Sequence, residues 1–485
     1  MYEAAEYLPQ ELLLATFKHM DRRTLKSIRL VCRLFAVLSW EEILRELTWH
    51  NPDGPANAEC WKADPALALR PRDLSVRFGT GPPKAYVLNR ISSFTQLEEL
   101  TILESVIPTQ LCDVLHQLRN IQSLTLDHCS LPETLMEPSL LLSRHSSNTS
   151  AVTTLKLNIV DPRLPHPHWG QELRCGGLIA LLPRMRTLHI DRCFLPVESL
   201  GSMTVELIIC IPHLGDGDTI RFGRKYFCRL LREMPQLQRL TATESQCKIR
   251  INSTSLQGIP HIAPITMDEL PILPRLTHFT GGTQLGHLAL SARHALEEVR
   301  IEEEGEAVIK FIEFLQLQQA SVRRLDIRVL KRWDAEVVRA VCYCLPSCEV
   351  LAIEHDGETA SEGELLDLGS HYLSHLVNLR ELSILQNPPQ IEEDIKDDAE
   401  IAGDLAYAMA LQLELSKMSR RQENDDKECI EDIHDELEPA GILACWTRNN
   451  HALLRARISW SGSIRWVREC HPYTKEWITY SVRMS

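Results

Sequence analysis

Apolar residues recur in one short pattern along most of this chain, from about residue 97 onward. The pattern is apolar-x-x-apolar-x-apolar, and several of its intervals fall between 24 and 33 residues. Its second half alternates apolar and polar residues, which predicts a β-strand with one buried face. Weaker members are expected near residues 205–211 and 276–281. The clearest instances are Leu97/Leu100/Ile102, Ile121/Leu124/Leu126, Val152/Leu155/Leu157, Met185/Leu188/Ile190, Leu237/Leu240/Ala242, Leu296/Val299/Ile301, Val322/Leu325/Ile327, Cys348/Leu351/Ile353 and Leu379/Leu382/Ile384.

Amphipathic stretches separate these predicted strands, for example at residues 178–182, 311–315 and 337–342. Cys129 and Cys193 follow the strand pattern at the position where cysteine-containing repeats bond the backbone of a turn. A strand and a helix repeated at this period are typical of leucine-rich repeats. The sequence therefore predicts an α/β fold, in which a curved solenoid has parallel strands on one side and helices on the outside.

Polar residues alternate with the buried positions of each strand and are expected on the concave strand face. Concave faces of solenoids usually bind partners, and rigid strands hold side chains accurately. Two other interpretations stay open. The strands can form an ordinary solvated face, or the insertions at 131–149 and 161–177 can carry recognition. The candidate substrate contacts on the strand face are His189, Arg239, Arg300 and Arg324.

Three short helices are predicted between residues 8 and 47. Pro9 stands near the first helical position, where the missing N–H costs little. Leu13 and Phe17 recur at helical spacing in the same stretch. Asp21 can cap a second helix by accepting hydrogen bonds from the next turn. A third helix carries Leu38 on its apolar stripe.

Motif residues in this segment occur in a known order: Leu8-Pro9-x-Glu-Leu-Leu, Phe17, Asp21, Leu25, Arg29, Val31-Cys32-Arg33-x-Phe35 and Leu38. The segment resembles an F-box across its full length, and the chain resembles fungal-type F-box proteins with degenerate leucine-rich repeats. This resemblance implies docking to the Skp-type adaptor of an SCF-type cullin–RING ubiquitin ligase. Phe35 is a departure, because many F-boxes have tryptophan there. The implied adaptor-binding residues are Leu8, Pro9, Leu12, Phe17, Val31, Cys32 and Phe35.

A second interpretation of the same segment is that it forms only the N-terminal cap of the solenoid, because about 40 residues close a poor core alone. The domain organisation that we expect places the F-box first and the repeats after it. The predicted parts are 1–50, the F-box; 51–90, a linker and an atypical first repeat; 91–390, the repeats; 391–440, a helix plus an acidic disordered loop; and 441–485, a C-terminal β-rich cap.

Charge is concentrated in one late segment. The formal net charge is −14, and residues 391–438 alone hold 17 Asp/Glu against 5 Lys/Arg. An acidic balance disfavours nucleic acid as a partner. No apolar run approaches the roughly 20 residues of a membrane span, and the first residues lack the features of a secretion signal. Fifteen cysteines without such a signal favour a reducing compartment. A cytoplasmic or nuclear protein without membrane partners is expected.

Motifs of catalysis and metal binding are not found in the sequence. It has no glycine-rich phosphate loop and no Gly-x-Ser-x-Gly turn. Cys342, Cys344 and Cys348 lack the paired spacing of structural zinc, and His371 and His375 lack a third ligand. We therefore expect no enzyme activity, no cofactor and no metal. The expected function is substrate recognition for a ubiquitin ligase. The alternative is a leucine-rich-repeat scaffold that binds proteins outside any ligase.

Overall fold

The computed structural model has two compact units. The first comprises Met1–Glu302 and Phe314–Ser321, and the second comprises Glu303–Glu313 and Val322–Ser485. Predictions that concern Leu8, Cys193, the two insertions and the acidic segment lie outside the described residues. The structure describes residues 9–50, 69–78, 83, 85–130, 150–159, 178–179, 182–191, 204–212, 227–245, 271–290, 296–303, 305–330, 333–356, 360–386, 439–460, 464–471 and 474–483.

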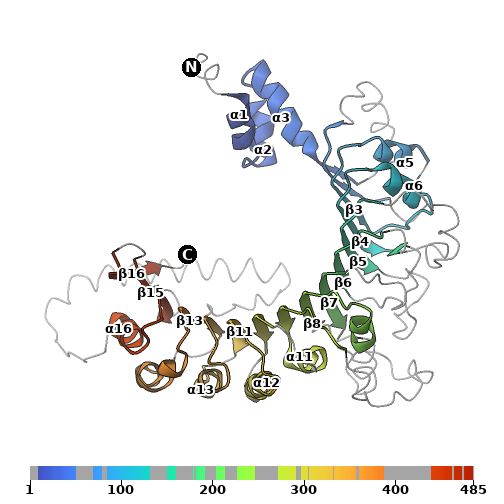
Figure 1. Cartoon of the computed structure of the whole chain (residues 1–485). Helices are drawn as coiled ribbons and strands as arrows, with labels where there is room; N and C mark the ends of the chain where they lie inside the picture. The colour runs from blue at the N-terminus through green and yellow to red at the C-terminus, as the bar shows by residue number, and fades with distance from the viewer. Residues whose placement is uncertain are drawn as a thin grey trace, which may run out of the picture. The chain divides into compact units, whose positions relative to one another are not determined.

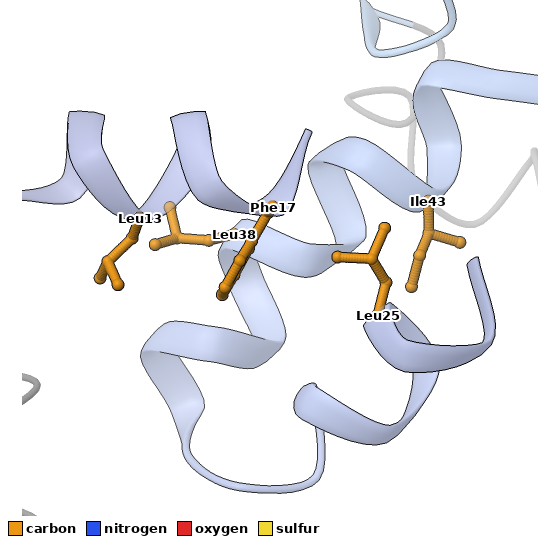
Figure 2. Packing of buried hydrophobic residues seen from close by; sticks show 5 residues of the cluster. All are labelled: Leu13, Phe17, Leu25, Leu38 and Ile43. Carbon is orange, nitrogen blue, oxygen red and sulfur yellow. The ribbon is translucent and has the colours of Figure 1, made fainter. Parts of the chain in front are cut away.

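Three helices lie in the N-terminal segment: α1 (Gln10–Phe17), α2 (Arg22–Ile28) and α3 (Arg33–Arg45). Asp21 caps α2, because its Oδ1 accepts hydrogen bonds from the backbone N–H groups of Arg23 at 2.8 Å and Thr24 at 2.9 Å. The three helices share a small apolar core (Figure 2). Its buried members are Leu13, Phe17, Leu25, Leu38 and Ile43.

The first unit continues as a parallel sheet in which each strand pairs with the next one along the chain (Figure 1). Aligned registers place equivalent residues side by side; Leu74, for example, lies opposite Leu100, which lies opposite Leu124. The strands of this unit are β1 (Glu46–Trp49), β2 (Asp73–Val76), β3 (Glu99–Leu103), β4 (Ser123–Cys129), β5 (Thr154–Ile159), β6 (Thr187–Asp191), β7 (Glu206–Pro212), β8 (Arg239–Ser245), β9 (His278–Gly281) and β10 (Glu298–Glu302).

The second unit has the same arrangement and a different end. β11 (Arg324–Leu330), β12 (Val350–His355), β13 (Glu381–Gln386) and β14 (Arg455–Trp460) are parallel. β15 (Ile464–Cys470) and β16 (Trp477–Arg483) then pair antiparallel. Most described residues between 455 and 483 are thus in strands.

Helices connect many of the strands and cover one side of the sheet within each unit (Figure 1). Apolar strand residues face them, which gives the alternating burial predicted from the sequence; Leu100 and Ile102 are buried while Glu99 is exposed. Each fully buried leucine in such a row contributes about 1.5–3 kcal/mol. The helices are α5 (Ala85–Ser92), α6 (Leu111–Gln117), α11 (Thr283–Ala289), α12 (Glu306–Leu317), α13 (Ala335–Cys344), α14 (Glu362–Asp367) and α16 (Pro439–Asn449).

Two short helices of other types follow α14 directly. The π-helix η6 (Leu368–Tyr372) leads into the 3₁₀-helix η7 (Leu373–His375), and α16 packs against both. Asn450, which follows α16, adds polar contacts to this packing. Its buried amide donates hydrogen bonds to the carbonyls of Leu373 at 2.8 Å and Leu376 at 2.9 Å. No helix in the described ranges is long and apolar enough to span a membrane.

The structure confirms an α/β fold with a mostly parallel sheet and extends the strand series. Within the described residues, sixteen strands follow one another in chain order. The weak members expected near 205–211 and 276–281 are the regular strands β7 and β9. Two further strands, β1 and β2, precede residue 97. Cys129 also bonds the backbone, because its Sγ donates to the carbonyl of Ile102 at 3.2 Å.

Candidate functional site

The helical module α1–α3 holds the residues implied to bind an adaptor, and it divides them into two groups. Pro9 lies at the N-terminus of α1 and is exposed. Leu12 and Val31 are each 56% exposed, although both are large apolar residues. These three residues can therefore contact a partner directly.

Phe17 and Phe35 pack against each other within the module, where Phe17 is buried and Phe35 is partly buried. Phe17 is only 3% exposed, and its ring meets the ring of Phe35 edge to face, with centroids 5.6 Å apart. Figure 2 shows Phe17 beside Leu38. Cys32 caps α3, with its Sγ 3.4 Å from the backbone nitrogen of Phe35. The structure gives these three residues packing roles, so substituting them would change the shape of the module rather than remove a direct contact to a partner.

Further exposed apolar residues in the module were missed by the sequence analysis. Leu30 is 79% exposed in the turn before α3, and Val37 and Trp40 are exposed on α3 itself. Val37 and Trp40 are three residues apart and so lie on one side of the helix. The guanidinium of Arg29 lies over the Trp40 ring, 5.2 Å from its centroid. The sequence offered one signal, because Val37 and Trp40 do not belong to the apolar stripe that contains Leu38 and could therefore have been placed on the exposed side of the helix.

The strand face of the first unit is the sheet surface with the polar residues that alternate with the buried ones. One row across it places a basic residue beside an acidic residue on neighbouring strands. Arg239 Nε lies 3.5 Å from Glu206 Oε1, and His278 Nε2 lies 3.4 Å from Glu298 Oε2. Thr187 donates to Glu206 at 3.2 Å. Exposed pairs of this kind contribute little stability, so Arg239 can exchange its partner at small cost.

His189 lies in the next row of the same face, opposite Lys156 on the neighbouring strand. Partial burial is the main cause that lowers the pKa of its imidazole, and the charge of Lys156 lowers the pKa further, against the opposing effect of Asp191. The ring is therefore mostly neutral at pH 7. His189 can offer a partner one donor and one acceptor rather than a positive charge.

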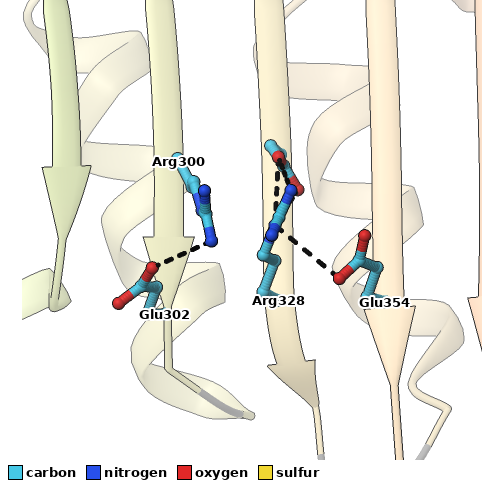
Figure 3. A network of polar contacts seen from close by, with 5 residues as sticks. Arg300, Glu302, Arg328 and Glu354 are labelled. Carbon is cyan, nitrogen blue, oxygen red and sulfur yellow. Dashed lines mark hydrogen bonds and ion pairs between the residues drawn. The ribbon is translucent and has the colours of Figure 1, made fainter. Parts of the chain in front are cut away.

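Arg300 lies on β10 with its Nη2 3.2 Å from Glu302 Oε1, two residues further along the same strand (Figure 3). Its Nε is buried and has no hydrogen-bond partner in the described part of the chain. Arg324 begins β11 in the second unit and is exposed. Each of the four candidate residues thus lies on a strand; Arg239 and Arg300 contact carboxylates, and His189 faces Lys156.

A compact charge network on the second unit was missed by the sequence analysis. Arg328 Nη2 donates to Asp326 Oδ2 at 3.0 Å, and its Nε lies 3.7 Å from Glu354 Oε2 on the next strand (Figure 3). Asp326 is buried, so its charge needs this partner. The spacing of Asp326 and Arg328, two residues apart on one strand, was the signal that places both side chains on the same face.

Acidic side chains stack at the beginning of the first unit's strand face. Glu46, Asp73 and Glu99 lie opposite one another on β1, β2 and β3. Burial and the charge of Glu99 raise the pKa of the Asp73 carboxyl above its ordinary value. Like charges placed opposite one another disfavour the sheet. This row is therefore a local site of electrostatic repulsion within the first unit.

Several cysteines are buried thiols. Burial raises the pKa of Cys112, Cys342 and Cys348 to about 12 and that of Cys129 to about 11. A thiol with a raised pKa is a poor nucleophile and a poor metal ligand at neutral pH. Within the described residues, no group of three or more His, Cys, Asp or Glu side chains is arranged to hold a metal ion.

The fold and these surfaces define a class, an α/β repeat protein with a mostly parallel sheet and a helical module at its N-terminal end. Neither a scan of protein-family models nor a search of curated proteins finds a match to the chain.

Proposed function

We propose that this chain is the substrate-recognition subunit of an SCF-type cullin–RING ubiquitin ligase. In this proposal the helical module is an F-box that binds a Skp-type adaptor, and the strands belong to leucine-rich repeats that bind a protein substrate. One observation carries the proposal: the helical module leaves many large apolar side chains exposed. These side chains are Leu12, Leu30, Val31, Val37 and Trp40.

The size of the module makes that exposure meaningful. Its own core contains five buried apolar residues, and a unit of about 40 residues rarely closes a stable core alone. Single exposed apolar residues are ordinary, but a concentration of them in a small unit is typical of an interaction site. A partner that covers them would stabilise the module by about 25 cal/mol for each Å² of apolar surface removed from water.

The strand face supports the second half of the proposal. In the first unit it presents charges of both signs on rigid strands, with Arg239 and Arg300 among them, and Arg324 is an exposed residue on a strand of the second unit. Arginine is enriched among residues that dominate interface energies, because its planar fork binds carboxylates while its stem packs. A substrate with carboxylate groups would replace Glu206 as the partner of the exposed Arg239, or Glu302 as the partner of the half-buried Arg300.

The test is co-precipitation with a purified Skp-type adaptor. Leu12→Asp/Val31→Asp places charges on the exposed apolar residues and leaves the core intact, so adaptor binding should fall at least about tenfold, since charges cannot be buried unpaired. The control is Val377→Asp, which charges an exposed apolar residue of the second unit and should bind as the wild type does. Circular dichroism checks that all variants are folded.

Unchanged adaptor binding by the Leu12→Asp/Val31→Asp variant, or no binding by the wild-type chain, would contradict the ligase role. The protein would then be a repeat scaffold that binds partners outside any ubiquitin ligase.

A further inference from the structure

A cavity on the second unit lies apart from the two surfaces described above. Its volume is about 370 Å³, and it is formed by the beginning of α13, the end of α14 and the π-helix η6. Two aromatic residues and four acidic residues contribute to its walls. These six are Trp333, Tyr372, Asp334, Glu336, Glu364 and Asp367.

The cavity has an excess of negative charge. Against its four carboxylates stands one guanidinium, that of Arg339, which pairs with Glu336 Oε1. Asp334 and Glu364 each use one oxygen to cap their own helices. Asp367 is exposed, and its carboxylate has no hydrogen bond or ion pair within the described residues, although its backbone carbonyl accepts from the Ser370 hydroxyl at 3.3 Å. Carboxylate oxygens without a partner thus line a cavity whose wall already includes the guanidinium of Arg339.

Aromatic rings extend the surface beyond the cavity. Arg339 lies over the Tyr372 ring, 5.0 Å from its centroid, which shows that a guanidinium fits at this wall. Tyr343 is 58% exposed, and its ring centroid lies 6.3 Å from that of Tyr372 and 5.1 Å from that of His375. The exposed aromatic surface continues past the space that one small cation would fill.

Trp333 contributes to the cavity wall, and its buried indole nitrogen is an unpaired donor next to the cavity, without a hydrogen-bond acceptor in the described part of the chain. A buried donor without an acceptor costs about 1–3 kcal/mol. The neighbouring η6 is a π-helix, and such turns are frequent at functional sites. A cationic ligand would match the excess of carboxylates in this cavity.

We propose that this cavity binds a lysine or arginine side chain from a basic segment of a partner protein. The cation would lie among the free oxygens of Glu336, Glu364 and Asp367, with the adjoining residues of the segment on Tyr343. A peptide is favoured over a small free cation, because the exposed ring of Tyr343 lies next to Tyr372 but outside the cavity, where only a longer ligand would reach it. This site is independent of adaptor binding and of the strand face.

The probe is a phage-displayed library of random 12-residue peptides, selected on the full chain. A selected peptide is then synthesised, and its affinity is measured by fluorescence polarisation. The cavity variant is Glu336→Gln/Asp367→Asn, which removes two charges and keeps side-chain size. The matched control is Glu381→Gln/Glu476→Gln, which removes two carboxylates of the same unit outside the cavity. A peptide with citrulline for arginine, or acetyl-lysine for lysine, tests the cation.

We expect selected peptides to be enriched in arginine or lysine. The cavity variant and the neutral peptide should each bind about tenfold more weakly, the scale of one charge-assisted hydrogen bond, while the control variant should bind as the wild type does. Neutral or acidic selected peptides, equal affinity for the cavity variant, or failure to enrich any sequence would overturn the proposal. Spermidine binding to the cavity without any peptide binding would also overturn it, in favour of a small cation.

Discussion

The indole nitrogen of Trp446 donates a 2.7 Å hydrogen bond to the backbone carbonyl of Leu365, which lies 81 residues earlier in the chain. Trp446 is fully buried, and it connects α16 to the end of α14. The repeat that ends in β14 is therefore joined to its predecessor by a directional bond as well as by apolar packing. This contact is the basis of the first two predictions.

Trp446→Phe should lower the free energy of unfolding by about 1–3 kcal/mol, because it removes the indole donor and leaves a small cavity. Urea unfolding followed by circular dichroism measures the change. Trp40→Phe is the control, since Trp40 is exposed, and a surface substitution should change stability by less than about 0.5 kcal/mol. Equal effects of the two substitutions would contradict the importance of the Trp446 contact.

Gly369→Ala should also disturb the packing of Trp446, because it adds an atom beside the ring of Trp446. A Cβ at Gly369 would lie 2.5 Å from Cδ1 of Trp446, closer than packed atoms allow. We expect a loss of about 1–3 kcal/mol from this overpacking. In a Trp446→Leu background the same alanine should cost less, with a coupling of at least about 0.5 kcal/mol. Additive effects in this double-mutant cycle would show that the clash is not with the tryptophan.

The buried thiols predict a loss of stability in alkali. Cys348 keeps its proton to about pH 12 in the folded chain, whereas an unfolded cysteine ionises near pH 8.5. Between these values the unfolded state binds fewer protons, so the free energy of unfolding falls as pH rises. Each such thiol contributes a slope of up to about 1.4 kcal/mol per pH unit.

Urea unfolding between pH 8 and 10, with a reductant present, measures this slope. Cys348→Ala should make the slope shallower by the contribution of one thiol. Val341→Ala is the control, because it shortens another buried side chain of the second unit without removing a titrating group. An identical slope for Cys348→Ala and the wild type would refute the assignment.

The acidic segment 419–438 should be dispensable for folding. Its sequence has few apolar residues and a strong excess of carboxylates, a composition that buries little surface. Replacing it with a Gly/Ser linker should shift Tm by less than about 2 °C, since loop length affects closure entropy only slowly. Differential scanning calorimetry would show a large drop in Tm if the segment instead supports the fold.

Charge reversal on the strand face should change the captured substrates. Arg300→Glu/Arg324→Glu alters two candidate contacts, and its control is Arg232→Glu/Arg275→Glu, which reverses two exposed arginines outside the strands. Proximity labelling in cells compares the proteins captured by each variant. We expect losses only for the strand-face variant. If deletion of the insertions at 131–149 and 161–177 changes the captured set and the strand-face variant does not, those insertions carry recognition.

Much of the fold could be predicted because each repeat has the same simple physics. Alternating apolar residues must face a common core, so strand positions follow directly from the sequence. β1 was missed although Leu44, Leu47 and Trp49 fit the strand pattern, because the third helix was predicted to continue to residue 47. β2 lies in the segment 51–90 that was predicted to hold an atypical first repeat, and its strand was not placed because Pro71 occupies the first apolar position of the pattern.

The candidate sites were less accessible to sequence reasoning. Leu13 and Phe17 are four residues apart, which could have placed Phe17 in the core rather than on a binding surface. The cavity lined by Trp333 and Asp367 joins residues from two successive repeats. No local pattern brings those two residues together, since their approach depends on how α13 and α14 pack. Sequence reasoning therefore located the repeats better than the surfaces between them.

Strand order has a consequence for how the protein is made. In each unit every strand pairs with the one that precedes it in the sequence, so a strand leaving the ribosome finds its partner already synthesised. Assembly can then follow translation, one repeat at a time. β14 is the slow step in this scheme, because its partner β13 ends at Gln386 and β14 begins only at Arg455. Until α16 has been synthesised, the apolar residues at the C-terminal end of the nascent sheet stay exposed. A chaperone would be needed most at this stage.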